Sequence, residues 1–500
     1  MSASALVLGA GLAGLTAAYE LAKRGVRVDV LEAAPSAGGR TTSFEDGSGR
    51  SLDTGLHVVA DHYANLIELL SELGVSKHLE WVESHTYLRA GKPPMHWYFS
   101  ARRPPFHLLR PIREMPLGVG GRLNLARVGL ELASYEQQDL ALLDELTYME
   151  WHRRRRLGRG FMLELAEAAA DAATFLTVQE VAARPVISWM KYLMRHQRAG
   201  DVGLWRGSLE QCLVRPLIDA IEARGGQVHT GVAVAGLEIG ATRVEAVRTA
   251  RSGAKHVCSQ ADGRVPLDSD TQAWKADYVI SALPVQALGP ALGEHAVRAA
   301  GCSDALKLGT TPALSVMVWF DRRIEPRPQG APLVTGCVMR DFIDLGSVGR
   351  APNGAAGSVY QFVLTRAKER MTQPDEAIVQ AVVRDLREVW PGARNAQVTD
   401  YAVERIGAAM FAARPGAHRL RPRTQTALSN FLLAGDYVQH DLNASMEGAA
   451  LSGRLAANAV LDQLGAPRAP VRRVPDPTVV PALRRLAHPL RQTWARAKVA

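Results

Sequence analysis

The sequence predicts an α/β protein with two or three domains. Its 500 residues exceed the roughly 100 to 200 of a usual domain. Hydrophobic residues make up 47% and charged residues 22%, an ordinary globular composition that excludes disordered, collagen-like and coiled-coil chains. Near both ends, a short apolar stretch typical of a buried strand runs into glycine and is followed by a helix of small residues.

The first elements form a strand, a glycine-rich turn, a helix and a second strand. Residues 5–8 are apolar and predict a buried strand, while residues 12–24 are rich in helix formers up to Gly25. Residues 26–31 alternate in the manner of a strand and lead to Glu32. This order of elements, ending in an acid, is the order of a dinucleotide-binding unit.

The glycine turn has the spacing that this kind of unit needs. Gly9 permits a tight turn, Gly11 lets a pyrophosphate approach the helix N-terminus, and Gly14 lets the helix and strand pack closely. Glu32 lies where a carboxylate can accept hydrogen bonds from a ribose. The Gly-Gly-Arg triplet at residues 38–40 suits a long ligand with a pyrophosphate, and therefore favours FAD over NAD.

A second strand-to-helix unit lies near the other end of the chain. Residues 431–434 predict a buried strand that runs into Gly435 and Asp436. Ser445 is a candidate N-cap for a small-residue helix over residues 447–460. A helix N-terminus carries about half a positive charge, so this one would stabilise the anion of a reduced flavin if it pointed there. A helix that only packs against its neighbours explains the spacing equally well.

Four stretches of the sequence resemble one known family. They are VLGAGLAGLTAAYELAKRG at residues 7–25, LEAAPSAGGR at 31–40, DTGLHVVADHYANLIELLSELG at 53–74, and LLAGDYVQHDLNASMEGAALSG at 432–453. Together they resemble the plant and cyanobacterial type of phytoene and ζ-carotene desaturase, within the flavin amine oxidoreductase superfamily. The resemblance implies that FAD is held by both ends of the chain.

The resemblance also implies which residues bind FAD. Val234 takes the place of the family's adenine-contacting valine, and Ala282 lies where the family's chain returns to the cofactor. The implied cofactor-binding residues are Gly9, Gly11, Leu12, Ala13, Gly14, Glu32, Ala33, Gly39, Arg40, Gly55, Leu56, His57, Val234, Ala282, Gly435, Asp436, Ser445, Met446, Glu447 and Ala449. No metal ligand set is expected, and no residue is identified as catalytic.

The expected fold is therefore α/β, with a Rossmann-like discontinuous FAD-binding domain, an α+β substrate domain and a candidate membrane-surface segment. The FAD-binding domain is assigned to residues 1–90, 205–290 and 416–465, the substrate domain to residues 91–204 and 291–415, and a basic tail to residues 466–500.

Several inner segments have clear secondary-structure patterns. Residues 209–224 predict a helix, residues 228–237 a strand, residues 241–275 a β-meander and residues 276–284 a strand. Within the substrate domain, residues 314–320 and 359–364 are apolar and β-prone, and residues 376–389 have helical spacing. Each such residue is expected in the core first, with some facing an apolar ligand.

The charge pattern points to anionic partners. Lys and Arg number 59 against 50 Asp and Glu, a formal net charge of +9. Residues 97–117 interleave aromatic residues, prolines and arginines, which favours a membrane interface. The basic tail predicts either a short membrane-surface helix or disorder, and the arginine run at residues 153–156 predicts a solvated helix face. Nucleic acid is not expected as a partner, because no recognition fold accompanies these charges.

The cysteines and the apolar stretches indicate where the protein acts. Four scattered cysteines are too few for a disulfide framework, so a reducing compartment is expected. No apolar run reaches the roughly 18 to 20 residues of a spanning helix. The expected location is cytoplasmic, peripheral on the cytoplasmic face of the membrane.

The motifs exclude several kinds of chemistry and leave a flavin reaction. The sequence has no HExxH, GxSxG or zinc-spaced cluster, and His57 and His62 are expected to be structural. Removing a hydride from an allylic C–H bond leaves a delocalised cation, so the flavin performs the difficult step and the protein orients the substrate. The neighbouring carbon must then lose a proton. Either a carboxylate or the reduced flavin accepts it, and both alternatives stay open.

The leading functional hypothesis is a FAD-dependent desaturase of a linear isoprenoid, such as the carotene precursors phytoene and ζ-carotene, that passes electrons to a membrane quinone. The first alternative is an enzyme like hydroxysqualene dehydroxylase, which uses reduced flavin to replace a hydroxyl group. The second is a flavin amine oxidase, which needs a polar route for an ammonium group and aromatic rings beside the flavin. Tyr437 is the candidate for such a ring.

Overall fold

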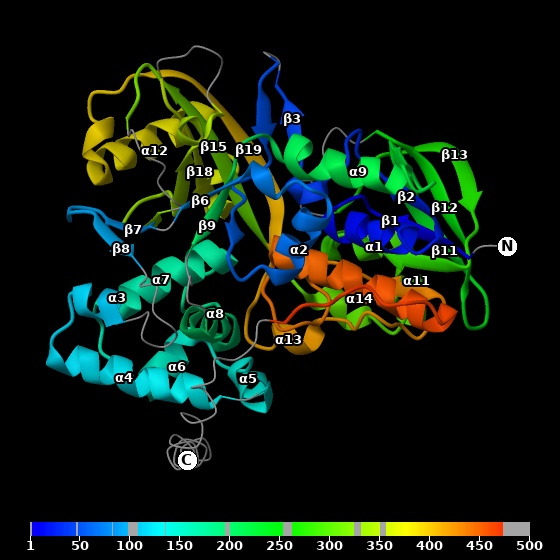
Figure 1. Ribbon diagram of the computed structural model, residues 1–500, viewed down its shortest axis with the longest axis horizontal. Helices are drawn as coiled ribbons and strands as arrows, with labels where there is room; N and C mark the ends of the chain where they lie inside the picture. The colour runs from blue at the N-terminus through cyan, green and yellow to red at the C-terminus, as the bar shows by residue number, and fades with distance from the viewer. Residues whose placement is uncertain are drawn as a thin grey trace.

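The computed structural model describes residues 3–46, 49–82, 84–98, 109–135, 137–195, 201–253, 263–324, 332–350 and 357–473. A five-stranded parallel sheet with the strand order β10-β2-β1-β14-β20 forms its centre (Figure 1). These strands are β1 (Ser4–Leu8), β2 (Arg27–Glu32), β10 (Gln227–Thr230), β14 (Tyr278–Ser281) and β20 (Phe431–Leu433). The sheet therefore joins stretches of chain that lie far apart in the sequence, and the α/β fold class is confirmed.

Both faces of this sheet are covered, as in other parallel sheets. Ala5 and Val7 of β1 share a core with helices on one face, whereas Leu6 and Leu8 share a second core with the antiparallel strands on the other face. The helices of the first face are α1 (Leu12–Ala22), α2 (Ala64–Glu72), α9 (Arg215–Glu222) and α14 (Met446–Leu464). The second face is covered by β11 (Val232–Ile239), β12 (Val244–Ser252), α10 (Leu288–Leu292) and α11 (Glu294–Ala299).

One predicted strand is divided for a local reason, and one predicted helix contains a π-helical turn. The single strand expected at residues 228–237 is broken at Gly231, whose φ of +71° turns the chain out of the parallel sheet and into the antiparallel one. The helix expected at residues 209–224 begins with a π-helical turn, Glu210–Val214, before α9. The meander expected at residues 241–275 is confirmed in its described part, with β12 paired to β13 (Leu267–Trp274).

A second, antiparallel sheet has the strand order β17-β18-β15-β19. Its strands are β15 (Thr310–Phe320), β17 (Asp341–Asp344), β18 (Val359–Leu364) and β19 (Val398–Phe411), and α12 (Asp375–Val389) packs on it. Smaller sheets join β3 (Ser43–Glu45) to β4 (Ser51–Asp53), β5 (Val59–Ala60) and β6 (Leu79–Val82) to β9 (Val202–Trp205), and β16 (Leu333–Thr335) and β8 (Met95–Tyr98) to β7 (Ser84–Arg89). The strands predicted at residues 314–320 and 359–364 are confirmed.

A layer of helices lies below the antiparallel sheet in Figure 1. It comprises α3 (Leu109–Glu114), α4 (Val119–Ser134), α5 (Gln137–Leu143), α6 (Tyr148–Arg154), α7 (Phe161–Thr174) and α8 (Ala183–Arg195), while the short α13 (Ala417–Leu420) lies further along the chain. None of the helices in the described ranges is both long and apolar enough to span a membrane.

The arginine run behaves as expected at all positions but one. Arg153, Arg154 and Arg156 are exposed. Arg155 instead turns inward, where its guanidinium pairs with Glu131 and lies 4.5 Å from the centre of the Trp151 ring. Of the segments predicted at the membrane, residues 99–108 and 474–500 lie outside the described residues.

A buried arginine ties the two ends of the chain together. Arg454 of α14 has no exposed side-chain surface, and its three guanidinium nitrogens lie 2.6–3.2 Å from carboxylates of Glu20, Glu68 and Glu72. These carboxylates belong to α1 and α2. Without Arg454, the fully buried Glu20 carboxylate would keep Arg24 as a cation but lose the one that ties it to α14, and removing a partner of a buried ion pair is strongly destabilising.

We expect Arg454→Met to lower the free energy of unfolding by about 3 kcal/mol, because three carboxylates lose a buried cation. The matched control is Lys23→Met, which removes an ion pair to the same Glu72 from a side chain that is 38% exposed. That change should cost less than about 1 kcal/mol. Urea denaturation of both variants measures the difference, and equal losses would contradict the role assigned to Arg454.

Candidate active site

A cavity of about 260 Å³ lies at the carboxyl ends of the parallel strands, against the glycine turn. Gly9 has a φ of +102°, and a Cβ there would lie 3.0 Å from the Ala282 carbonyl oxygen. At Gly14 a Cβ would lie 2.0 Å from the Gly9 oxygen, so close packing requires glycine at both positions. Gly11 differs, since its φ is −72° and a Cβ would meet no atom within 4 Å. Its missing side chain therefore leaves open space toward the cavity.

Glu32 ends β2 at the edge of the same cavity. Its carboxylate accepts hydrogen bonds of 2.9 Å from the backbone N–H groups of Ala10 and Ala34. The residue is only 5% exposed, and burial raises the pKa of the carboxyl above its usual range. The acid thus holds the glycine turn against the end of its strand.

Arg40 and Asp436 meet across the cavity although the sequence separates them widely. The guanidinium lies 2.8 Å from the Asp436 carboxylate and also donates to the Ala409 carbonyl. Asp436 lies three residues after β20, the last strand of the parallel sheet. This ion pair joins the segment after β2 to the segment that leads into α14.

The loop between β20 and α14 is shaped by a buried arginine that the sequence did not indicate. Arg421 donates hydrogen bonds of 2.6–3.1 Å to five backbone carbonyls of this loop, those of Asp436, Tyr437, Val438, His440 and Leu442. Burial lowers the pKa of the guanidinium to about 10. The sequence around Arg421 contains other arginines, and nothing in its spacing distinguishes the one that is buried.

The N-terminus of α14 also borders the cavity, an arrangement that the spacing of the sequence left open. Ser445 accepts a hydrogen bond of 3.0 Å from the Gly448 N–H, which confirms it as the N-cap. Glu447 does not face the cavity. Its carboxylate instead accepts from the backbone N–H groups of Asn65 and Leu66 at the start of α2.

The structure gathers most of the predicted cofactor residues around this cavity. Those that line it are Gly9, Gly11, Leu12, Ala13, Glu32, Ala33, Gly39, Arg40, Gly55, Leu56, His57, Ala282, Gly435, Asp436, Ser445, Met446 and Ala449. Gly14, Val234 and Glu447 do not line it. Gly14 packs against Gly9, and Glu447 binds the start of α2. Val234 lies in the core between the parallel sheet and the antiparallel strands β11 and β12. The sequence predicts proximity along a motif, but not which way each side chain points.

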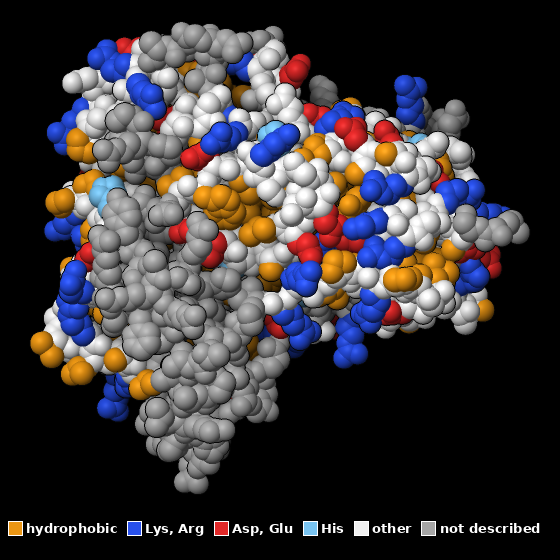
Figure 2. All heavy atoms as spheres, in the orientation of Figure 1, with side chains coloured by type: hydrophobic (Ala, Val, Ile, Leu, Met, Phe, Trp, Pro, Cys, Tyr) orange, Lys and Arg blue, Asp and Glu red, His pale blue; other side chains and the backbone are white. Residues whose placement is uncertain are grey.

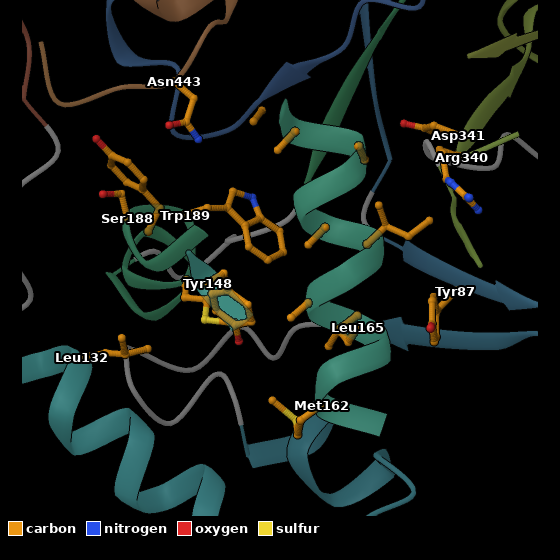
Figure 3. Close-up of a pocket in the computed structure, with 18 of the residues that line it drawn as sticks. Tyr87, Leu132, Tyr148, Met162, Leu165, Ser188, Trp189, Arg340, Asp341 and Asn443 are labelled. Atoms are coloured by element: carbon orange, nitrogen blue, oxygen red, sulfur yellow. The ribbon is translucent and has the colours of Figure 1, made fainter. Parts of the chain in front are cut away.

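A second cavity of about 1000 Å³ borders the first. The residues that border both cavities are Leu56, His57, Phe175, Val363, Met410, Ala444, Ser445 and Met446. The larger cavity extends between α4, α7 and α8 (Figure 3), and most of its lining is aliphatic or aromatic. Ala166, Ala169, Ala172 and Ala173 give it a wall of small side chains along α7. Sequence reasoning did not indicate these helices as its walls.

His57 lies at the junction of the two cavities and is neutral. Its Nδ1 lies 2.8 Å from the Gly55 carbonyl, which can only accept, so Nδ1 carries the proton. Burial lowers the pKa of the imidazole below its usual value. His62 lines only the larger cavity, where it stacks on Tyr192 with ring centres 4.9 Å apart. Among the described residues, no group of three or more His, Cys, Asp or Glu side chains is arranged to hold a metal.

The smaller cavity fits a flavin dinucleotide. Gly11 leaves space at the N-terminus of α1, where unpaired N–H groups favour a pyrophosphate, and Glu32 stands beside it. Ser445 and Met446 place the N-terminus of α14 on the opposite border, next to the larger cavity. These features define a flavoprotein oxidoreductase in which the cofactor site borders a separate apolar cavity.

Comparison with known proteins identifies the family. Residues 12–461 match the flavin containing amine oxidoreductases, and the chain belongs to this family. Its cofactor is FAD, in agreement with the glycine turn and Glu32.

Curated relatives cover most of the chain. The sequence is 26% identical over 479 residues to a 15-cis-phytoene desaturase of Synechococcus elongatus, which covers 91% of this chain and 95% of the relative. It is 26% identical over 484 residues to a zeta-carotene desaturase of Synechocystis sp., and the match covers 91% of this chain and 96% of the relative. The 15-cis-phytoene desaturase of Solanum lycopersicum is 25% identical, with 91% and 77% covered.

Solved structures share the fold. An oxidoreductase from Methanosarcina mazei superposes with a TM-score of 0.67 at 19% identity, covering 90% of this chain and 98% of that one. Cyclohexylamine oxidase from Brevibacterium oxydans gives a TM-score of 0.64 at 17% identity, covering 93% and 100%. At these identities the likeness establishes the fold alone.

We expect Gly11→Val to abolish flavin retention, because its side chain would fill the space left for the pyrophosphate. The matched control is Gly118→Val, since Gly118 also precedes a helix, has a φ of −68° against −72° for Gly11, and likewise has no atom within 4 Å of a Cβ. Flavin absorbance per protein after gel filtration measures retention. A yellow Gly11→Val protein, or equal loss in the control, would contradict the assignment.

Proposed function

We propose that this protein is a FAD-dependent desaturase of a linear isoprenoid, such as the carotene precursors phytoene and ζ-carotene. The observation that carries the proposal is the long apolar cavity that borders the flavin site along a shared set of residues. Relatives that cover nine-tenths of the chain bear the names of phytoene and zeta-carotene desaturases, which agrees with an apolar isoprenoid substrate.

We further propose that the predicted residues around the smaller cavity are the FAD-binding residues, with Gly14, Val234 and Glu447 in supporting roles. The close contacts of Gly14 and the hydrogen bonds of Glu447 support this division. The strand order of the parallel sheet supports a further proposal, a discontinuous FAD-binding domain. Its three segments are residues 1–90, 205–290 and 416–465, and each contributes strands to the sheet.

Bound FAD supplies an acceptor for the hydride that leaves an allylic C–H bond. The chain's own part is to hold a long hydrocarbon in one orientation and to exclude water from the reacting carbon. Phe175, Met410 and Met446 suit this task, because they border both cavities with apolar side chains. The alanines along α7 leave room for an extended chain to pass beside that helix.

The position of Tyr437 weighs against a flavin amine oxidase. Its ring is 1% exposed, lines only the smaller cavity and packs against the backbone of Gly435. It therefore does not face the larger cavity, where an amine substrate would need an aromatic ring beside the flavin.

A membrane surface is the proposed source of the substrate, and a quinone dissolved in it the proposed electron acceptor. Val119 and Leu123 of α4 are 78% and 67% exposed, and α4 also forms a wall of the larger cavity. Hydrophobic side chains gather over α4 at the lower left of Figure 2, and Arg113 and Arg127 are exposed close by in sequence. This mixture suits the boundary between headgroups and acyl chains. We place the protein in the cytoplasm, on the membrane's inner face.

The decisive measurement is the anaerobic absorption spectrum of the liposome-bound protein before and after addition of phytoene or ζ-carotene. We expect the oxidised flavin bands to bleach while a longer polyene appears. Ala173→Phe should slow this bleaching about tenfold or more without changing flavin content, because Ala173 lines only the larger cavity. A wild-type spectrum that stays oxidised with both substrates would refute the proposal.

We expect the double variant Val119→Asp with Leu123→Asp to bind liposomes about tenfold more weakly, because two apolar side chains no longer enter the acyl region. Leu306→Asp is the control, since Leu306 is 41% exposed and lies against Gly289 of α10, a helix that belongs to a different core from α4. Sedimentation with liposomes measures binding. Equal pelleting of the double variant and wild type would exclude α4 as the contact.

A further inference from the structure

One side of the larger cavity is polar, although the rest of its lining is mainly apolar. The residues that make it so are Arg340, Asp341 and Thr365, which we call the Asp341 patch. In Figure 3, Arg340 and Asp341 lie on the opposite side of α7 from Tyr148 and Trp189. A hydrocarbon substrate gives no reason for polar groups at this position.

Two members of the patch are held in place by Asp171 of α7. The Arg340 guanidinium lies 2.7 Å from the Asp171 carboxylate, and the Thr365 hydroxyl donates to it. Arg366 adds a second cation 2.8 Å from the same carboxylate. The Asp171 carboxylate is therefore paired within the protein. Its contacts hold Arg340 and Thr365 in place in the cavity wall.

Asp341 differs from Arg340 and Thr365, because no contact with Asp171 explains its position. Its Oδ1 atom is buried and meets no hydrogen-bond partner among the described residues. Burial raises the pKa of its carboxyl well above the usual range, which favours a neutral group that can donate a hydrogen bond. A buried polar atom without a partner costs free energy that a suitable ligand atom would recover.

The pairing of strands places Asp341 beside the flavin site. Asp341 of β17 lies directly opposite Val363 of β18 in an antiparallel pair, so the two side chains project from the same face about 5 Å apart. Val363 borders both cavities, and Thr365, two residues further along the chain, lines the larger one. The Asp341 carboxyl keeps a hydrogen bond from the backbone of Phe342, and its Oδ1 atom, which has no partner among the described residues, lies near the junction and not at the far end of the cavity.

We propose that the Asp341 patch binds a hydroxyl or carbonyl oxygen carried by an isoprenoid ligand of the larger cavity. The ligand class is thus an oxygenated isoprenoid, either a prenyl alcohol acting as substrate or a prenylquinone acting as oxidant. The inference rests on the proposed function only in taking the occupant to be an isoprenoid chain. It differs in requiring an oxygen atom near the flavin.

The test compares three probes on the flavin-loaded protein: geranylgeraniol, the hydrocarbon of the same carbon skeleton without the hydroxyl, and a prenylquinone with a chain of similar length. Binding is measured by titrating the change in flavin absorbance. Asp341→Leu removes both polar oxygens at similar volume, whereas Asp341→Asn keeps a donor and an acceptor. Leu165→Ala, on the apolar part of the same cavity, is the control that should weaken all three probes alike.

We expect Asp341→Leu to weaken the alcohol, the quinone or both by about tenfold, with hydrocarbon affinity unchanged and Asp341→Asn close to wild type. If only the alcohol binds more weakly to the variant, the patch binds a substrate hydroxyl. If only the quinone binds more weakly, the patch binds the carbonyl of an oxidant. Unchanged affinity for both oxygenated probes would overturn the proposal.

Two further readouts keep the result decisive. If Asp341→Leu does not fold, the wild type still decides, because the patch requires the alcohol to bind at least as tightly as the hydrocarbon, and weaker binding would overturn the proposal. Turnover of phytoene and ζ-carotene is measured separately. If neither hydrocarbon is turned over but the alcohol binds selectively, the proposed hydrocarbon substrates are refuted and the Asp341 patch is still supported.

Discussion

The close contact between α1 and α14 is the constraint on which the site depends. A Cβ at Gly453 would lie 2.4 Å from the carbonyl oxygen of Ala13, so the two helices touch backbone to backbone. This approach sets the glycine turn before α1 and the Ser445 cap of α14 on borders of one cavity. Arg454 then holds the pair through carboxylates of α1 and α2. A flavin bound there would be enclosed by segments from the first and last parts of the chain.

The two cavities divide the chemistry between them. The smaller one offers backbone N–H groups, glycines and an ion pair, which suit a charged dinucleotide. The larger one offers mostly apolar walls, and the Asp341 patch is one of the places where polar groups interrupt them. Because these environments meet along a few shared side chains, a substrate can reach the flavin while its remaining length stays in an apolar surrounding.

Local motifs predicted the strands and helices around the cofactor, because each depends on neighbours in the sequence. The capping of α14 by Ser445 and the turn at Gly9 are of this kind. Arg421 and Glu447 could not be assigned in this way, since their roles come from residues that only the folded chain brings close. The walls of the larger cavity were missed for the same reason: a stripe of alanines looks the same whether it packs on a helix or faces empty space.

The order of strands in the parallel sheet has a consequence for how the protein is made. β1 pairs with β14, and β14 pairs with β20, so the sheet closes only after residue 433 has been synthesised. Contacts between such distant residues form slowly, because the intervening chain must first be brought together. A chain interrupted before β20 would leave β14 as an exposed edge strand and would lack the α14 border of the cofactor cavity, so we expect FAD to bind late in folding.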